Sequence, residues 1–176
     1  SKDNINKAYN LISTSKVRNE MIIDDVITCV ARKQTPVILT RFKEHAKFLH
    51  DALKKKADHV FLLYGDNSDK ENAEIRVKLK QIPENESLIL VATGQKIGEG
   101  FDFPRLDVLM LAAPVSFEGR LEQYVGRLNR DYVGKEAVYV YDYIDSHVRY
   151  FDKMCMKLVD CLEKCLIYRH IRRFAD

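Results

Sequence analysis

The sequence has no apolar run near the roughly 20 residues that a membrane-spanning helix needs, which argues against a transmembrane protein. It has only four cysteines, and no Cys-x-x-Cys pair. Cys155, Cys161 and Cys165 fall in one stretch of helical character, where they either bind a metal with His170 or pack as reduced, small apolar side chains. The lack of paired cysteines and of a His-x-x-x-His pattern favours packing. We therefore expect a cytoplasmic protein without a metal site.

The sequence also lacks a strong excess of either charge. Its 176 residues carry a net charge of +3, and 46% of them are hydrophobic. This composition is typical of one globular domain. A charge this small does not by itself indicate a nucleic-acid-binding protein, and local clusters such as 54–56 are typical of solvated helix faces.

Apolar periodicity predicts alternating helices and strands. Helices are expected over residues 17–33, 42–56, 69–81, about 117–129 and 147–174, and strands over residues 37–40, 60–64, 87–92, 108–112 and 137–143. Ser68 or Asp69 is expected to cap the predicted helix over 69–81. The strands are continuously apolar, which is typical of a parallel sheet covered on both faces. We therefore predict the α/β class, with three layers and a mainly parallel sheet, closed by a long C-terminal helix.

In such a sheet, ligands bind beyond the carboxyl ends of the strands. The residues expected there are 40–41, 64–66, 93 onward and 113–114. The segment after residue 93 is informative, because the Thr93 hydroxyl is suited to hold a phosphate. Gly98 and Gly100 allow close approach of a ligand, and Asp102 is an acceptor suited to a ribose hydroxyl. The alternative is an ordinary loop with two glycines.

The segment 120–130 has a second pattern. Its apolar residues recur at helical spacing and form a buried stripe: Leu121, Val125 and Leu128. Gln123, Arg127 and Arg130 repeat that spacing on the opposite side, which places one amide and two guanidinium groups on one ridge. Gly126 costs this helix about 1 kcal/mol relative to alanine, which indicates that another group approaches closely. The alternative is a solvated basic face.

Taken together, these segments resemble the second RecA-like domain of superfamily-two helicases. Residues 93–104 are similar to helicase motif V, residues 123–130 match the motif VI pattern Q-x-x-G-R-x-x-R, and residues 36–49 are similar to motif IV. The resemblance covers roughly residues 17–143, and within the superfamily it is nearest to type III restriction subunits and DNA-repair helicases. It implies a RecA-like αβα domain over 17–146, with an N-terminal extension over 1–16 and a C-terminal helical segment over 147–176.

The resemblance also implies roles for individual residues. Arg127 and Arg130 would be arginine fingers that reach the γ-phosphate of ATP held by the other lobe, and Gln123 would orient groups in the same cleft. The nucleotide would be contacted by Gly100, Asp102 and Gly126. The phosphate backbone of one nucleic-acid strand, with DNA favoured, would be contacted by Thr93, Thr40 and Arg41.

The sequence has no phosphate-binding G-x-x-x-x-G-K-[ST] loop and no DEAD or DEAH box. Asp24 and Asp25 are the nearest approach to a magnesium-binding carboxylate pair, and they are expected to be solvated. ATP and Mg²⁺ would therefore be bound mainly by the first RecA-like domain of the same polypeptide. We expect a domain of a longer ATP-dependent helicase or translocase, without ATPase activity in isolation.

Two other functions are alternatives. One is a non-catalytic RecA-like module that binds nucleic acid or a protein partner and never faces an ATP site. The other is an enzyme with a dinucleotide-binding fold, which would need a glycine fingerprint directly after the first strand. Residues 40–43 contain no glycine, and this interpretation is discounted.

Overall fold

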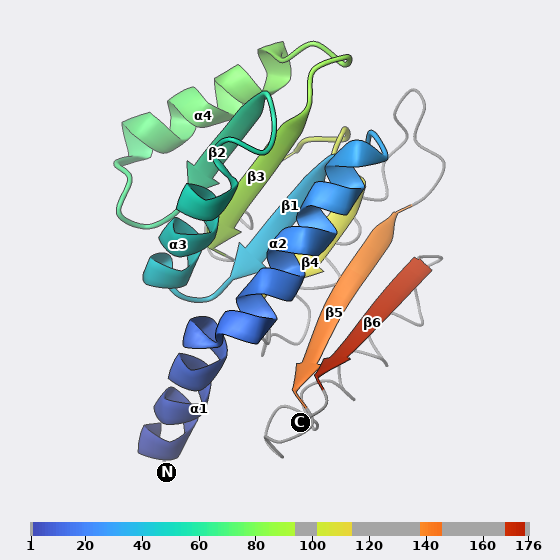
Figure 1. Cartoon of the computed structure of the whole chain (residues 1–176). Coiled ribbons are helices and arrows are strands. Elements are labelled where there is room, and N and C mark those ends of the chain that lie inside the picture. Colours follow the sequence, from blue (N-terminus) through green and yellow to red (C-terminus); the bar gives the residue numbers. More distant parts are fainter. Residues whose placement is uncertain (1, 94–101, 114–137, 146–167, 175–176) are drawn as a thin grey trace.

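The computed structural model describes residues 2–93, 102–113, 138–145 and 168–174, and its strands form one six-stranded sheet (Figure 1). The strands are β1 (Pro36–Thr40), β2 (His59–Leu63), β3 (Leu88–Thr93), β4 (Val108–Leu111), β5 (Tyr139–Asp145) and β6 (Tyr168–Phe174). Their order across the sheet is β2-β3-β1-β4-β5-β6, and every neighbouring pair is parallel. The predicted α/β class with a parallel sheet is confirmed.

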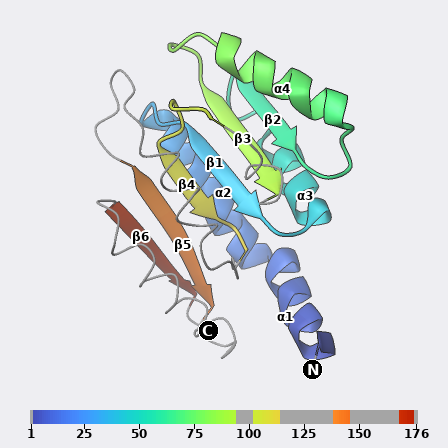
Figure 2. The same cartoon turned by 180° about the vertical axis from the view of Figure 1, so that it is seen from behind.

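Helices lie on both faces of this sheet. They are α1 (Lys2–Thr14), α2 (Lys16–Ala31), α3 (Lys43–Leu53) and α4 (Asp69–Gln81). Figures 1 and 2 show α2 and α3 on one face and α4 on the other, with α1 beyond the carboxyl end of β1. Among the described residues, no helix combines the length and the apolar character needed to cross a bilayer.

The core is split into two parts by the sheet. Every residue of β1 and β3 is buried, and side chains along each strand alternate between the two faces. In β1, Val37 and Leu39 join the cluster that contains Leu79 of α4, whereas Ile38 joins the cluster that contains Leu49 of α3. Two covered faces explain why the strands are continuously apolar in the sequence. Each such side chain contributes about 1.5–3 kcal/mol through burial.

Helix α4 begins at a capping box. The Ser68 hydroxyl accepts the Glu71 N–H at 3.1 Å, and the Glu71 carboxylate accepts the Ser68 N–H at 2.6 Å. These bonds satisfy two backbone donors that an isolated helix end leaves unpaired. They also lower the pKa of Glu71. Of the two predicted caps, Ser68 is the one used.

We expect Ser68→Ala to lower the free energy of unfolding by about 1 kcal/mol, because the first turn of α4 loses its side-chain acceptor. Urea denaturation followed by circular dichroism measures this change. Lys70→Ala, in the same exposed turn, is the matched control and should change the value by less than about 0.5 kcal/mol. Equal stability of the Ser68→Ala variant and the wild type would show that the cap does not contribute.

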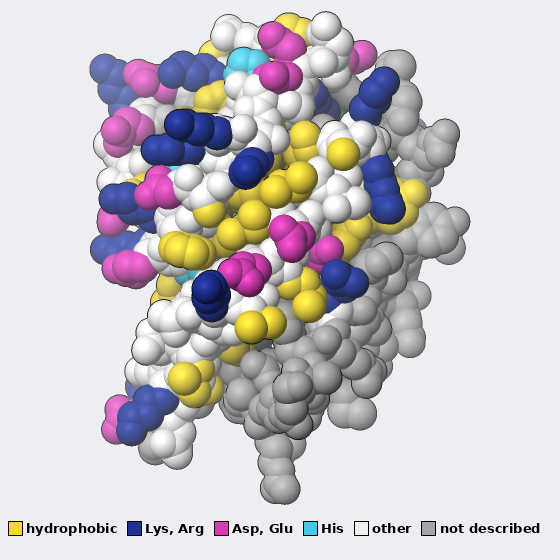
Figure 3. All heavy atoms as spheres, in the orientation of Figure 1, with side chains coloured by type: hydrophobic (Ala, Val, Ile, Leu, Met, Phe, Trp, Pro, Cys, Tyr) yellow, Lys and Arg dark blue, Asp and Glu magenta, His cyan; other side chains and the backbone are white. Residues whose placement is uncertain are grey.

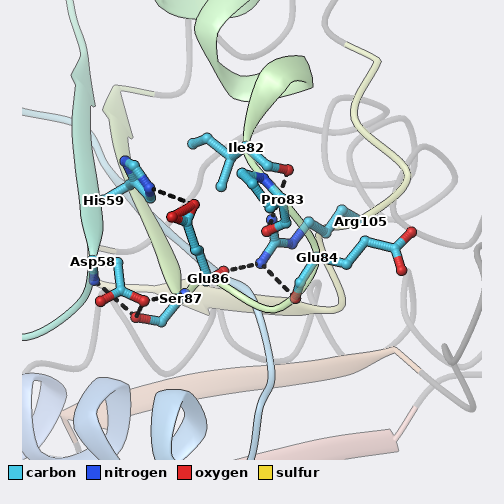
Figure 4. Close-up of polar contacts among 8 residues, drawn as sticks. All are labelled: Asp58, His59, Ile82, Pro83, Glu84, Glu86, Ser87 and Arg105. Atoms are coloured by element: carbon cyan, nitrogen blue, oxygen red, sulfur yellow. Dashed lines mark hydrogen bonds and ion pairs between the residues drawn. The ribbon is translucent and has the colours of Figure 1, made fainter.

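The loop between α4 and β3 is fastened at the amino end of the sheet (Figure 4). The Arg105 guanidinium donates to the carbonyl of Pro83 at 3.1 Å and also to that of Glu86. At the start of β3, the Ser87 N–H donates to the Asp58 carboxylate at 2.8 Å, and this bond lowers the pKa of Asp58. These contacts hold the loop at the end of the sheet opposite the predicted ligand site, which indicates a structural role.

The prediction of one helix over residues 147–174 is wrong for residues 168–174, which form β6. This strand pairs with β5 from Tyr139↔Tyr168 to Asp145↔Phe174, and residues 146–167 lie outside the described part of the chain. Its arginine-rich sequence, YRHIRRF, is compatible with a helix by propensity. Pairing with the neighbouring strand β5 overrides that weak preference.

The C-terminal strand is also tied to helix α2. The Arg172 guanidinium contacts the Asp25 carboxylate, with Nε 3.2 Å from Oδ2, and the Tyr143 hydroxyl donates to the same carboxylate at 2.9 Å. Only 13% of the Asp25 side chain is exposed. The expectation that Asp24 and Asp25 are both solvated is therefore wrong for Asp25.

Candidate functional site

The segments predicted to bind ligands meet at the carboxyl end of the sheet. Thr40 at the end of β1 pairs in register with Thr93 at the end of β3. Ala112, directly after β4, donates its N–H to a β1 carbonyl at 2.8 Å. Lys43, the first residue of α3, and Asp66, from the loop after β2, form an ion pair at 3.0 Å that raises the pKa of Lys43. Parallel pairing thus brings together residues that are more than 50 positions apart in the sequence.

The Thr40 side chain lies inside the protein, at 4% exposure, in a chain of hydrogen bonds. Its hydroxyl is 2.7 Å from Nδ1 of His45, and Nε2 of His45 is 2.8 Å from Oδ1 of Asn19. Because Nδ2 of Asn19 donates to the Ser13 carbonyl at 2.9 Å, its Oδ1 accepts, and His45 carries its hydrogen on Nε2. The Thr40 hydroxyl therefore donates to His45.

Two buried basic side chains lie next to each other beneath this end of the sheet. Burial lowers the pKa of His45 to about 4, and the positive charge of Arg18 contributes to this lowering. Arg18 is 1% exposed and donates to the carbonyls of Ala112 and Tyr143, the latter at 3.4 Å. At neutral pH, His45 is thus uncharged and Arg18 supplies the buried positive charge, at the carboxyl ends of β4 and β5.

Arg41 is the exposed cation that directly follows β1, and it is held by an aromatic side chain. Its guanidinium carbon lies 4.7 Å from the centre of the Tyr9 ring. Tyr9 is 1% exposed and meets Phe42 edge to face, with ring centres 5.6 Å apart. Sequence reasoning missed Tyr9, because residues 1–16 were interpreted as an extension. The apolar residues Ile5, Tyr9 and Ile12, at i, i+4 and i+7, were the available signal.

A concavity of about 820 Å³ lies beside these residues, between α1, α2 and α3. Its lining includes Phe48, Ile23, Glu20 and Glu44. Figure 3 shows hydrophobic side chains gathered over α2 and α3 on the same face, and Phe48 is 52% exposed. The lining also includes Lys16 and several amide and hydroxyl side chains. With two carboxylates and one lysine, it carries no excess of positive charge that would attract a phosphate backbone.

Most of the other predicted site residues lie outside the part of the chain that the structure describes. Asp102 is exposed at the start of a described segment. Five other residues lie outside the described part of the chain: Gly100, Gln123, Gly126, Arg127 and Arg130. Their roles, and those of Thr93, Thr40 and Arg41 in binding nucleic acid, stay predictions.

Comparison with known proteins identifies the family. The model of the helicase conserved C-terminal domain matches residues 18–131, which is more than half of the chain. The chain belongs to this helicase domain family. The resemblance that the sequence motifs predicted is thereby confirmed, and the matched helicase region includes all the motif VI residues from Gln123 to Arg130. The narrower likeness to type III restriction subunits and DNA-repair helicases stays a prediction.

Similar sequences occur in poxviruses. The chain is 31% identical over 120 residues to transcript termination protein A18 of Yaba-like disease virus, covering 67% of this chain and 24% of that protein. It is 28% identical over 135 residues to the protein of the same name from fowlpox virus, covering 75% of this chain and 28% of that protein. The chain thus spans about a quarter of the length of these relatives.

Solved helicase structures share the fold. T4 UvsW superposes with a TM-score of 0.73 at 20% identity, covering 96% of this chain and 37% of that one. Domain 2 of the DEAD-box helicase Mss116p, solved bound to an RNA duplex, superposes with a TM-score of 0.63 at 19% identity, covering 96% of this chain and 60% of that one. The chain therefore has the RecA-like fold of superfamily-two helicase C-terminal domains.

Proposed function

We propose that this chain is the second motor domain of an ATP-dependent helicase or translocase that acts on nucleic acid, with DNA favoured. The observation that carries the proposal is the pairing of Thr40 with Thr93, which joins the motif IV-like and motif V-like segments at one end of the sheet. The family match covers residues 18–131, a range that includes the segment with Arg127 and Arg130, and it supports the proposal at the level of the domain family.

In this proposal, Arg127 and Arg130 act on ATP that a neighbouring lobe holds. The departing phosphoryl group spreads negative charge over its oxygens, and a fixed guanidinium stabilises that charge better than mobile water does. Gln123 would orient groups in the same cleft, and Gly100, Asp102 and Gly126 would contact the nucleotide.

The described residues do not fit a magnesium site of their own. Asp25 is already engaged by Tyr143 and Arg172. Within the described part of the chain, no three His, Cys, Asp or Glu residues gather as metal ligands would. We therefore assign Mg²⁺ and most of the ATP contacts to the first RecA-like domain of a longer polypeptide, the full-length protein.

The contact with nucleic acid is assigned to the backbone of one strand. Arg41 is exposed and positively charged, which suits a phosphate oxygen. The Thr40 side chain is buried, its hydroxyl donates to His45 and its backbone pairs with β3. Thr40 would therefore support the strand contact by fixing the end of β1, from which Arg41 reaches the phosphate. Such contacts bind a strand without reading its sequence.

A non-catalytic RecA-like module is the alternative function. It shares the fold and the binding surface but uses no ATP. The two functions differ at Arg127 and Arg130, whose removal matters for ATP hydrolysis only if this domain faces a nucleotide.

We expect the purified 176-residue chain to hydrolyse ATP no faster than the buffer, with or without single-stranded DNA, because it lacks a phosphate-binding lysine loop. A phosphate-release assay measures the rate. Binding of the same DNA by the same preparation is the positive control for folding. If the isolated chain hydrolyses ATP and Arg127→Ala abolishes this activity, the assignment of ATP binding to a separate first domain is refuted.

A further inference from the structure

The contact between Arg41 and Tyr9 joins the proposed strand-binding surface to helix α1, which lies before the family-matched region of residues 18–131. Arg41 follows β1 directly, so its backbone is fixed by the sheet, but a long arginine side chain has several freely rotating bonds. A guanidinium 4.7 Å from the ring centre of Tyr9 is restricted to one region by cation–π attraction. Tyr9 therefore limits the positions that the Arg41 charge visits.

An aromatic contact of this kind suits a phosphate-binding arginine. The ring occupies one face of the guanidinium and leaves the N–H groups at the edge of the planar group free to donate to a phosphate. Among the described residues, Arg41 has no carboxylate partner that would compete for those N–H groups. The charge is thus held in place without being neutralised.

Tyr9 is itself held firmly. It is 1% exposed, and it packs with Ile12 and Phe42. The end of α1 is joined to α2 by two hydrogen bonds. The Ser15 N–H, at the cap of α2, donates to the Ile12 carbonyl at 3.3 Å, and the Asn19 amide donates to the Ser13 carbonyl at 2.9 Å. Helix α1 therefore packs against the carboxyl end of the sheet and is held in place by α2.

We propose that Tyr9 is a positioning residue for nucleic-acid binding: its ring holds Arg41 in the orientation that contacts a backbone phosphate. This inference rests on the proposed function of Arg41. It assigns a role in strand binding to α1, the helix that the sequence predicts only as an N-terminal extension.

The test is a double-mutant cycle in the full-length protein, with Kd for a single-stranded oligothymidine measured by fluorescence anisotropy at several salt concentrations. We expect Arg41→Ala to weaken binding about tenfold and to reduce the salt slope by about 1. Tyr9→Leu should weaken it about two- to fivefold, because the ring is lost and the charge is kept. The double variant should bind no more weakly than Arg41→Ala alone, since Tyr9 acts only through Arg41.

Two controls separate positioning from general stability. Tyr9→Phe keeps the ring and should restore wild-type affinity. Leu11→Ala removes an exposed side chain from the same helix and should leave the affinity unchanged. If Tyr9→Leu does not fold, as judged by circular dichroism, Tyr9→Met takes its place in the cycle, because methionine is unbranched and fills the site without a ring.

Three outcomes overturn the inference. Additive losses in the double variant would show that Tyr9 acts independently of Arg41, and wild-type affinity of Tyr9→Leu would show that the ring is not needed. In both cases a weakened Arg41→Ala variant would leave the proposed strand contact intact. Unchanged binding by Arg41→Ala would refute that contact as well.

Discussion

Replacing Arg127 by alanine in the full-length protein should lower the rate of ATP hydrolysis about 10³–10⁵-fold. The guanidinium would stabilise charge that develops on the phosphoryl group during transfer, so its loss acts on the transition state more than on the bound substrate. We therefore expect kcat to fall while the KM for ATP changes by less than about fivefold. Arg130→Ala should lower kcat in the same direction. Steady-state phosphate release in saturating nucleic acid measures both constants.

The control for this prediction is Lys80→Ala, which removes an exposed cation from α4. Its kcat should equal that of the wild type. Nucleic-acid affinity, measured in parallel, should be retained in the Arg127→Ala variant, because Arg41 and not Arg127 is assigned to the strand. If Arg127→Ala and Arg130→Ala both hydrolyse ATP at the wild-type rate, the non-catalytic module becomes the better account.

Acidification from pH 7 to pH 4 should destabilise the wild-type chain by about 3 kcal/mol more than the His45→Gln variant. The pKa of His45 is lowered from 6.5 to about 4 in the folded protein. Between these values the unfolded chain binds a proton that the folded chain does not, so stability falls as the pH falls. Above pH 7 both states are neutral at this position, and the effect disappears.

Urea denaturation at a series of pH values measures the difference, because all other titrating groups are common to the two proteins. The glutamine side chain of the variant keeps hydrogen-bonding groups but cannot titrate. The control is Phe48→Leu on the same helix, which changes an exposed side chain that cannot titrate. It should keep the wild-type pH dependence. If the free energy of unfolding depends on pH in the same way in the wild type and in His45→Gln, the assignment of a buried, neutral imidazole is contradicted.

Much of the fold follows from local patterns in the sequence. The strands β1 and β3 are buried on both faces, so they appear as continuous apolar runs, and the predicted bounds of α4 equal the observed ones because Ser68 and Pro83 mark its two ends. The strand β6 was not predicted from the sequence. Polar and apolar residues do not alternate regularly in residues 168–174, and pairing with β5, nearly 30 residues earlier, leaves no signal in the local sequence.

Only those parts of the candidate site that depend on the order of parallel strands could be predicted from the sequence. The closeness of Thr40 and Thr93 follows from placing two parallel strands side by side, whatever their side chains do. The contacts of His45 with Asn19 and of Arg41 with Tyr9 depend on helix packing, and a single histidine or tyrosine carries no periodic signal. The hydrogen bond between the Thr40 hydroxyl and His45 was missed for the same reason.

The most direct test of the account is a structure of the full-length protein with ADP, Mg²⁺ and aluminium fluoride, which mimics the transferring phosphoryl group. The account predicts that the guanidinium groups of Arg127 and Arg130 lie about 3 Å from the fluoride ligands, at hydrogen-bonding distance. Both arginines turned away from the nucleotide, in ion pairs within their own domain, would contradict it.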